Sequence, residues 1–540
     1  MGYIYFPQFK KGKEGLKIHP GLTILDFAQK LQIKINAECG GIGKCGKCIV
    51  RIEKGEENLS KLTSSERKIN LPEKHRLACQ ARVIKDISDI VVYIKEFGEY
   101  EILKYGMERE VEICPVYQKK EDKVCKDNKE IDVYRNGIFG LAVDIGTTTI
   151  VFDIVNLENG DIIGTIAKTN PQIIFGNDVI SRIEYVMVDK KEKRFLNPDE
   201  RYQKLLELQK VVVDLINESI KEFNNDIKNS IYQAVIVGNP TMRDIFFLHD
   251  ISPLGKTPYE PLILQGITKK PEEIGLDINK NGEIYGLPLI GGHVGADIVA
   301  DILASEIYNE EKVCMIIDIG TNGEIVIGNK EKLFATSCAA GGAFEGVNIS
   351  CGIGGIEGAI KEVKILNGKV YYSTIGNKYP LGICGSGLID LLSEMLKNKI
   401  IDEKARFRNE INEFYITGDI KINQQDIFQL ITSKAAIRTA WQILSKIYPV
   451  EIEKIEKIYL SGGFGNFINI ESAINIGLIP DIEREKIIKI GNGAIEGARE
   501  VLLCSDKRKL AEDIARKVKH IKTNEIEKDF DFLLASNMYF

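Results

Sequence analysis

The sequence lacks a long apolar run. Nowhere among its 540 residues do consecutive hydrophobic residues reach the roughly 18 that a membrane-spanning helix needs. The beginning, Met1 to Phe6, also lacks the basic segment and the small-residue cleavage site of a secretory signal. We therefore expect a cytoplasmic protein that does not bind membranes.

A compact stripe of lysine and arginine with interleaved aromatic residues is missing too, so we expect no binding to nucleic acid. Low-complexity tracts and short-period repeats are also absent. Hydrophobic residues make up 44% of the chain and charged residues 28%, with a net charge of −6. This composition is typical of soluble globular proteins and excludes disordered, collagen-like and disulfide-scaffold classes. At roughly 100–200 residues per domain, the length indicates several domains.

The eleven cysteines are the first positive signal. In a cytoplasmic protein we expect them to be reduced rather than paired in disulfides. Three of them fall within ten residues and a fourth follows at a distance, which is the spacing of a plant-type 2Fe–2S site. Glycines between them permit the positive φ values of a loop around a cluster. The predicted metal ligands are Cys39, Cys45, Cys48 and Cys79.

A zinc site is the alternative for these thiols, but zinc knuckles usually pair two Cys-x-x-Cys units, and only one is present. The flanking pattern predicts strands at 3–6, 16–19, 49–52 and 87–94, and a helix at 24–31 that Thr23 caps. Residues 1–97 resemble the α+β, β-grasp ferredoxin domains. Five residues separate Cys39 from Cys45, as in adrenodoxin-like ferredoxins. Most of the seven other cysteines are expected to be reduced core or linker thiols, and a second cluster that uses Cys338, Cys351 or Cys384 stays an alternative.

Residues 98–136 are polar and weakly periodic, and we interpret them as a linker. Two similar segments follow, Leu141–Val151 and Met315–Ile325. In each, an apolar strand ends in an aspartate, turns through Gly-Thr and returns as a second strand. The backbone N–H groups and threonine hydroxyls of such turns suit phosphate oxygens. Carboxylates beside them suit Mg²⁺. Two ordinary hairpins remain the simpler interpretation at this point.

A third segment, Ile458–Asn466, is a buried strand that leads into a glycine turn suited to contact with an adenosine. Together with the hairpins it resembles the superfamily of acetate and sugar kinases, 70-kDa heat-shock chaperones and actin. The resemblance implies a duplicated, ribonuclease-H-like α/β ATPase body at 137–540, with subdomains at about 137–310 and 311–540. Residues 295–308 and 490–498 are similar to its connecting helices.

A ferredoxin domain fused to such a body resembles the reductive activators of corrinoid-dependent enzymes. Further segments resemble motifs of that family: Asn170–Gln172, Gly176–Ile183, Val237–Met242, Gly291–Asp297 and Ser337–Gly346. The resemblance implies that a 2Fe–2S cluster reduces inactive Co(II) to Co(I) with the help of ATP and Mg²⁺. It implies a corrinoid protein as partner, either a corrinoid iron–sulfur protein or the corrinoid subunit of a methyltransferase. It does not identify the electron donor, and a homodimer stays an open alternative.

Within the ATPase we assign roles as hypotheses. Asp144 and Asp318 are expected to organise Mg²⁺. Asp297 is the first candidate for orienting the attacking water and His293 the second. Ser337 is a candidate for facing the partner. The expected phosphate and adenosine contacts are Gly146, Thr147, Thr148, Thr149, Gly320, Thr321, Asn322, Gly462, Gly463, Phe464 and Gly465.

Three other functions stay open. An activator of 2-hydroxyacyl-CoA dehydratases or benzoyl-CoA reductases also couples ATP to electrons, but its cluster is held by cysteines of the ATPase domain. A small-molecule kinase with a redox domain would need a sugar-binding signature, which we do not find. A non-enzymatic redox sensor or filament protein would not need both Asp144 and Asp318.

Overall fold

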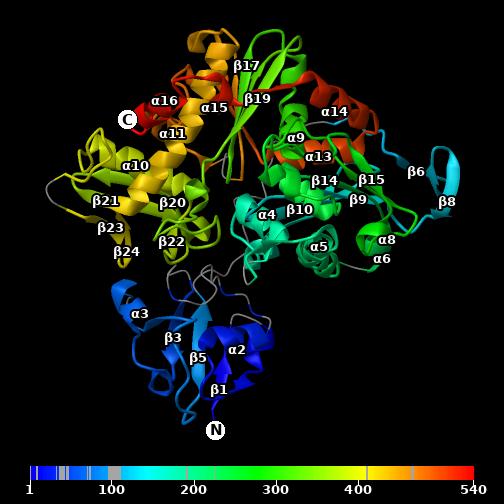
Figure 1. Cartoon of the computed structure of the whole chain (residues 1–540). Helices are drawn as coiled ribbons and strands as arrows, with labels where there is room; N and C mark the ends of the chain where they lie inside the picture. The colour runs from blue at the N-terminus through cyan, green and yellow to red at the C-terminus, as the bar shows by residue number, and fades with distance from the viewer. Residues whose placement is uncertain are drawn as a thin grey trace. The chain divides into compact units, whose positions relative to one another are not determined.

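A computed structural model describes residues 2–7, 10–31, 33, 35, 43, 48–69, 71, 74–94, 111–189, 192–223, 225–408, 411–463 and 467–540. The chain divides into two compact units, residues 1–98 with 173–177, and residues 99–172 with 178–540. Figure 1 gives the labels of the elements. In the described ranges, no helix has both the length and the apolar character needed to cross a membrane.

The first unit is a five-stranded mixed sheet with a short helix packed on it. The helix, α2 (Ile24–Lys30), begins where predicted: the Thr23 hydroxyl accepts the Asp26 N–H, and the Asp26 carboxylate accepts the Thr23 N–H. Its buried side chains join the core beneath the sheet. The β-grasp prediction is confirmed. In sheet order the strands are β2 (Leu16–Lys17), β1 (Tyr3–Tyr5), β5 (Ile90–Ile94), β3 (Ile49–Lys54) and β4 (His75–Leu77).

The second unit contains two six-stranded sheets that share the order of five strands, while the sixth strand lies beside the last parallel strand in the first sheet and beside the third meander strand in the second. In each, a three-stranded antiparallel meander continues into two strands parallel to its first strand. The first sheet runs β11 (Ile162–Thr169), β10 (Thr149–Asn156), β9 (Phe139–Ile145), β14 (Ile231–Val237), β16 (Glu283–Gly286) and β15 (Ile267–Lys269). The second runs β26 (Ile487–Gly491), β25 (Ile458–Ser461), β17 (Cys314–Ile319), β18 (Gly323–Gly328), β19 (Leu333–Cys338) and β27 (Lys519–His520). The duplicated body is therefore confirmed.

Two helices, α9 (Ala296–Ser305) and α13 (Gly493–Leu503), pack between the sheets, as Figure 1 shows. A Cβ on Gly497 of α13 would lie 2.2 Å from the carbonyl oxygen of Ala300 in α9, so glycine permits this close contact. Alternate residues of β17 face this layer and an outer core, which is why the strand is apolar up to Asp318. These two helices are the predicted connecting helices.

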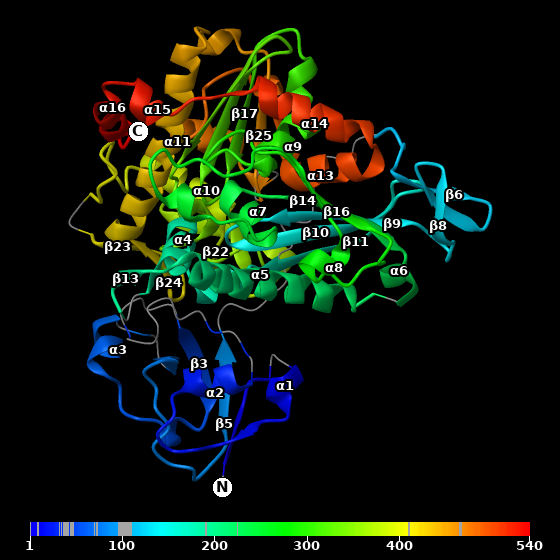
Figure 2. The same ribbon diagram turned by 45° about the vertical axis from the view of Figure 1, so that its right-hand side comes forward.

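Other helices cover the outer faces of the sheets. In Figure 2, α5 (Pro198–Ile220) lies on the side of the first sheet opposite to α13. The core on the outer face of the second sheet includes side chains from α10 (Gly385–Lys397), α11 (Gln424–Ile447) and α12 (Ile470–Asn475). The central strands of each sheet are therefore buried on both faces, and the loops at their ends are left to form the site.

The segment predicted as a linker contains a small antiparallel sheet. Its strands are β6 (Tyr117–Lys120), β7 (Lys123–Lys126) and β8 (Lys129–Val133). Tyr117 and Val124 are fully buried in the core that also contains α9 and α13. The segment after residue 116 is therefore packed against the ATPase body, although its charged sequence shows little periodicity.

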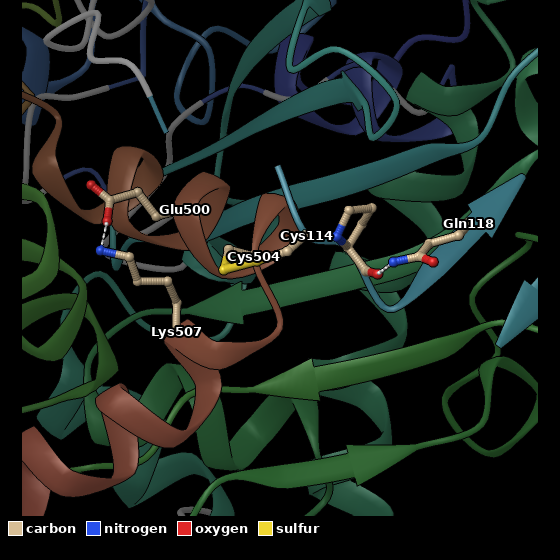
Figure 3. Close-up of a disulfide and its surroundings, with 6 residues drawn as sticks. Cys114, Gln118, Glu500, Cys504 and Lys507 are labelled. Atoms are coloured by element: carbon tan, nitrogen blue, oxygen red, sulfur yellow. Dashed lines mark hydrogen bonds and ion pairs between the residues drawn. A yellow bond between two sulfur atoms is a disulfide. The ribbon is translucent and has the colours of Figure 1, made fainter. Parts of the chain in front are cut away.

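The expectation that no cysteines pair is wrong at one position. Cys114 and Cys504 form a disulfide at the C-terminal end of α13, as Figure 3 shows. Backbone hydrogen bonds join the same segments: the Cys114 N–H donates to the Leu503 carbonyl at 2.8 Å, and the Ser505 N–H donates to the Cys114 carbonyl at 3.0 Å. The two cysteines are 390 residues apart, so sequence spacing gave no sign of the pair.

Candidate functional site

The tips of the two predicted hairpins meet at one cavity. Its empty volume is about 1040 Å³, including space open to solvent. The turn between β9 and β10 faces the turn between β17 and β18, and the glycine turn after β25 lies beside them. The predicted residues that line the cavity are Asp144, Gly146, Thr147, Thr148, Thr149, Asp297, Asp318, Gly320, Thr321, Asn322, Gly462 and Gly463. Phe464 and Gly465 lie outside the described residues.

Three aspartates in this cavity carry unusually high pKa values. Burial, followed by the neighbouring charge of Asp144, raises the pKa of Asp318 to about 7. Burial also raises the pKa of Asp144 to about 7, against a hydrogen bond from Asn492 that lowers it. The pKa of Asp297 rises to about 7 through burial and the charge of Asp318. Among the described residues, Oδ1 of Asp318 has no hydrogen-bond partner. Carboxylates that face one cavity suit Mg²⁺, which keeps several of its waters and needs only one or two carboxylate contacts.

Buried polar side chains shape the turn of the first hairpin. Asn170 donates through Nδ2 to the Gly146 carbonyl at 2.8 Å. The guanidinium of Arg182, fully buried in α4 (Val179–Met187), donates to the Thr147 carbonyl at 2.6 Å. Asn239 donates to the Thr147 hydroxyl at 3.0 Å. Because the turn's carbonyls are bonded on the protein side, its shape is fixed before any ligand binds.

The glycine turn after β25 contacts the second hairpin closely. Gly462 has a φ of 109°, and a Cβ there would lie 2.4 Å from the Ile319 carbonyl oxygen and 2.8 Å from Oδ1 of Asp318. Any other side chain at this position would therefore collide with the predicted Mg²⁺ carboxylate. Because residue 462 is a glycine, the Asp318 carboxylate can occupy its position in the lining of the cavity.

The two candidates for orienting water lie in different places. Asp297 stands in the first turn of α9 and lines the cavity, where its Oδ1 accepts the Ile298 N–H at 2.9 Å. His293 is not among the cavity residues; its ring centroid lies 5.9 Å from that of Tyr259. Burial lowers the pKa of His293, with smaller effects from Glu260 and Lys522. The geometry therefore favours Asp297 over His293.

Ser337 lies beside the cavity and not in its lining. Its hydroxyl donates to Oε1 of Glu324 at 3.1 Å, and Glu324 itself lines the cavity. Burial raises the pKa of Glu324 well above its usual range, with smaller effects from Asp297 and Asp318. In the described part of the chain, Ser337 thus has a partner within its own subdomain.

Several cavity residues were not assigned from the sequence, above all Glu324, Glu345 and Asn492. Oε2 of Glu345 accepts hydrogen bonds from the hydroxyls of Thr321 at 2.5 Å and Thr148 at 3.2 Å. Glu345 does lie in a segment that resembles a family motif, but its partners are 24 and 197 residues away. Only the folded chain shows which carboxylate reaches both hairpins.

In the first unit, strand pairing brings Cys48 and Cys79 together. Ile49 of β3 pairs with Leu77 of β4, and the Ala78 N–H donates to the Cys48 carbonyl at 2.8 Å. The two buried sulfur atoms lie 3.2 Å apart without a disulfide, and a hydrogen bond from Cys48 is the largest cause that lowers the pKa of Cys79 to about 6. Adjacent thiols with thiolate character fit iron ligation. Cys39 and Cys45 lie outside the described residues.

The remaining described cysteines give no sign of a second cluster. Among the described residues, the one group with three possible metal ligands is Glu112, Cys114 and Cys504, and the disulfide already joins its two sulfur atoms. Cys338 lies on β19, and Cys351 and Cys384 are buried in the core of the second half. None of these three belongs to such a group.

Comparison with known proteins assigns most of the chain to three family models. Residues 9–83 match the 2Fe–2S iron–sulfur cluster binding domain. Residues 139–310 match the RACo middle region, and residues 312–540 match the C-terminal domain of RACo, the ASKHA domain. The models therefore cover the cysteine site and both halves of the ATPase body.

Individual relatives match over most or all of the chain. The corrinoid activation enzyme RamQ of Eubacterium limosum is 29% identical over 98% of this chain and 98% of its own. A reductase of the Co(II) methylated amine-specific corrinoid protein from Methanosarcina barkeri is 23% identical over 71% of this chain and 73% of its own. The solved structure of a reductive activator for corrinoid, iron–sulfur protein covers 100% of this chain and 98% of its own, with a TM-score of 0.72 and 29% identity.

The fold and the two sites thus define a 2Fe–2S ferredoxin domain fused to an ATPase of the ASKHA class. The chain belongs to the RACo family of reductive activators. The resemblance inferred from the sequence is confirmed, and so are the cluster, ATP and Mg²⁺ as its cofactors.

Proposed function

We propose that the protein reactivates a corrinoid protein by delivering one electron from its 2Fe–2S cluster to inactive Co(II), which becomes Co(I), at the expense of ATP. One observation carries the proposal: a single chain combines the adjacent thiols of Cys48 and Cys79 with a cavity lined by three half-buried aspartates of raised pKa. A relative that matches 71% of the chain is a reductase of the Co(II) methylated amine-specific corrinoid protein.

The proposal assigns a role to each part of the cavity. Asp144 and Asp318 hold Mg²⁺, because their oxygens face the cavity from both hairpins. The threonine hydroxyls and turn N–H groups bind phosphate oxygens. Asp297 orients the attacking water from the first turn of α9. Gly462 and Gly463 contact the adenosine side of the nucleotide.

ATP is needed because the electron transfer is unfavourable by itself. Plant-type clusters have potentials of about −400 mV, and the Co(II)/Co(I) couple is expected to lie lower. Each additional 100 mV costs about 2.3 kcal/mol per electron. Nucleotide binding can offset this cost only if it changes the affinity for the two states of the partner. The cavity between the two halves suits this task, because its lining residues come from both.

The partner in this proposal is a corrinoid iron–sulfur protein or the corrinoid subunit of a methyltransferase. Each class can be offered in its Co(II) form to the same preparation. Light scattering with and without the partner then measures whether the activator works as a homodimer.

The test follows the absorption of Co(I) in an oxygen-free mixture of the loaded protein, a Co(II) corrinoid protein and a reductant. We expect Co(I) to accumulate with ATP and Mg²⁺ and not when ATP is withheld. The Asp318→Asn variant serves as a matched control that keeps the shape of the cavity and removes one carboxylate. Equal Co(I) yields with and without ATP would refute the proposal.

A further inference from the structure

Glu345 joins the two phosphate hairpins across the cavity. It lies at the end of the short helix η6 (Ala343–Glu345) in the second half of the body. Its Oε2 accepts from the hydroxyl of Thr321, in the second hairpin, at 2.5 Å. The same oxygen accepts from the hydroxyl of Thr148, in the first hairpin, at 3.2 Å. The hydroxyl oxygens of Thr148 and Thr321 are 3.3 Å apart.

These contacts use the protons that a phosphate oxygen would need. A threonine hydroxyl carries a single proton. Thr321 directs its proton to Glu345, and the proton of Thr148 points either to Glu345 or to the oxygen of Thr321. Neither threonine can donate to a phosphate while Glu345 keeps this position. A carboxylate oxygen and a phosphate oxygen are both anionic acceptors, so they compete for one place.

Two glycines flank the short helix that carries Glu345. Gly342 and Gly346 flank η6 with φ values of 68° and 83°, which other residues adopt only with strain. Before the loop, the Ala340 carbonyl accepts a hydrogen bond from Ser433 in α11. The side chains of Ala343 and Phe344 are buried in the core and the Gly341 N–H donates to the Thr321 carbonyl at 2.9 Å, so the backbone around Glu345 is anchored and the carboxylate moves by rotation of its own side chain.

We propose that Glu345 is an internal competitor for the phosphate site: its carboxylate holds Thr148 and Thr321, and it leaves both when the nucleotide polyphosphate binds. This inference rests on the proposed function, because it concerns the nucleotide site of the ATPase. Movement of Glu345 would couple nucleotide binding to residues 340–346 and, through the hydrogen bond between Ser433 and the Ala340 carbonyl, to α11. In the opposite role Glu345 would hold Mg²⁺ and aid nucleotide binding. Its removal would then weaken the binding of the nucleotide instead of strengthening it.

The test measures the Kd of ADP with Mg²⁺ for the full-length, cluster-loaded protein by calorimetry. We expect Glu345→Gln and Glu345→Ala to bind ADP more tightly than the wild type, by about tenfold for the alanine variant, which lacks the competing acceptor. Glu357→Gln is the matched control, because Glu357 is an exposed glutamate of the same half. This control should keep the wild-type Kd.

Two outcomes have different meanings. If the wild type binds ADP and both Glu345 variants bind it equally or more weakly, the competitor role is overturned and the proposed function stands. If the wild type does not bind ADP at all, the proposed function itself fails. The melting temperature of each variant without nucleotide shows that the body is folded in the comparison.

Discussion

Nδ2 of Asn492 lies 3.0 Å from Oδ2 of Asp144, although 348 residues separate them in the chain. The same side chain caps α13, because its Oδ1 accepts the Ile495 N–H at 3.1 Å. One amide therefore joins the N-terminus of α13 to the aspartate of the first hairpin. A movement of α13 relative to β9 would change the surroundings of that aspartate directly.

Asn492→Ala should reduce both stability and nucleotide affinity. Loss of the helix cap costs about 1 kcal/mol. Loss of the hydrogen bond to Asp144 also makes its charged form less favourable, so we expect a higher KM for Mg·ATP. Asn469→Ala is the matched control, because Asn469 caps α12 in the same way and does not line the cavity. Steady-state ATPase kinetics and thermal melting measure the two effects. An equal rise in KM for both variants would contradict the role of Asn492.

The raised pKa of Asp318 makes a prediction about pH. Its folded value is about 7 against a reference value of 3.8, so between about pH 4 and 7 the folded state holds a proton that the unfolded chain has lost. Stability should therefore fall as the pH rises through this window. Asp318→Asn removes part of this fall, and its melting temperature should exceed that of the wild type by about 2–4 °C at pH 8.

At pH 5 the difference in melting temperature between Asp318→Asn and the wild type should be small. At pH 8, Mg²⁺ should raise the melting temperature of the wild type more than that of the variant. Asp419→Asn, at an exposed aspartate of the same half, is the control and should melt like the wild type at both pH values. If the difference in melting temperature between Asp318→Asn and the wild type were the same at pH 5 and pH 8, the Asp318 carboxylate would not cause the fall in stability with rising pH.

Local sequence patterns predicted the helices, strands and turns around the sites, whereas contacts between residues far apart in the chain could not be predicted. Thr23 and Asp26 are three residues apart, so the start of α2 was visible in the sequence. The aspartate–glycine–threonine turns were visible for the same reason. Glu345 and Asn492 act on residues up to 197 and 348 positions away, and no local period encodes such contacts. The Cys114–Cys504 disulfide was missed for this reason too.

Peptide mapping of protein purified in air should find Cys114 linked to Cys504. Because the bond closes a chain segment of 390 residues, its reduction should lower the free energy of unfolding by about 2–5 kcal/mol. Cys114→Ser should melt at the same temperature with and without dithiothreitol. Cys125→Ser is the control, because Cys125 is a free, buried thiol on β7 and should leave the effect of dithiothreitol unchanged. Absence of the linked peptide would contradict the assignment.

Glu66 should be essential for retention of the cluster. Its buried carboxylate accepts from Arg76 at 2.9 Å and from the Leu77 N–H at 3.0 Å, just before Cys79. Although burial raises its pKa, the hydrogen bonds from Arg76, Thr63 and Leu77 together lower it. Glu66→Ala leaves the Arg76 charge buried without its partner, at a cost of about 3–5 kcal/mol.

We expect the Glu66→Ala variant to lose its 2Fe–2S absorption several times faster than the wild type under mild heating. Glu53→Ala breaks an ion pair with Arg51 in which both side chains are about half exposed, so this variant should retain the cluster. Equal rates of loss for the two variants would show that the buried pair does not support the cluster site.

The last prediction separates electron delivery from ATP hydrolysis. Removal of residues 1–97 deletes the ferredoxin domain and leaves all described residues of the nucleotide cavity, which lie between 144 and 494. The truncated protein should therefore hydrolyse ATP, with stimulation by a Co(II) corrinoid protein, at a rate close to that of the full chain. It should not produce Co(I), because no cluster can pass on an electron. Full-length Cys79→Ser is the matched variant, which loses a predicted cluster ligand and keeps the domain. Stopped-flow spectra of the Co(I) band, recorded beside phosphate release, measure both activities. If the truncated protein still reduced cobalt with a physiological donor, the ferredoxin domain would not be the route of the electron.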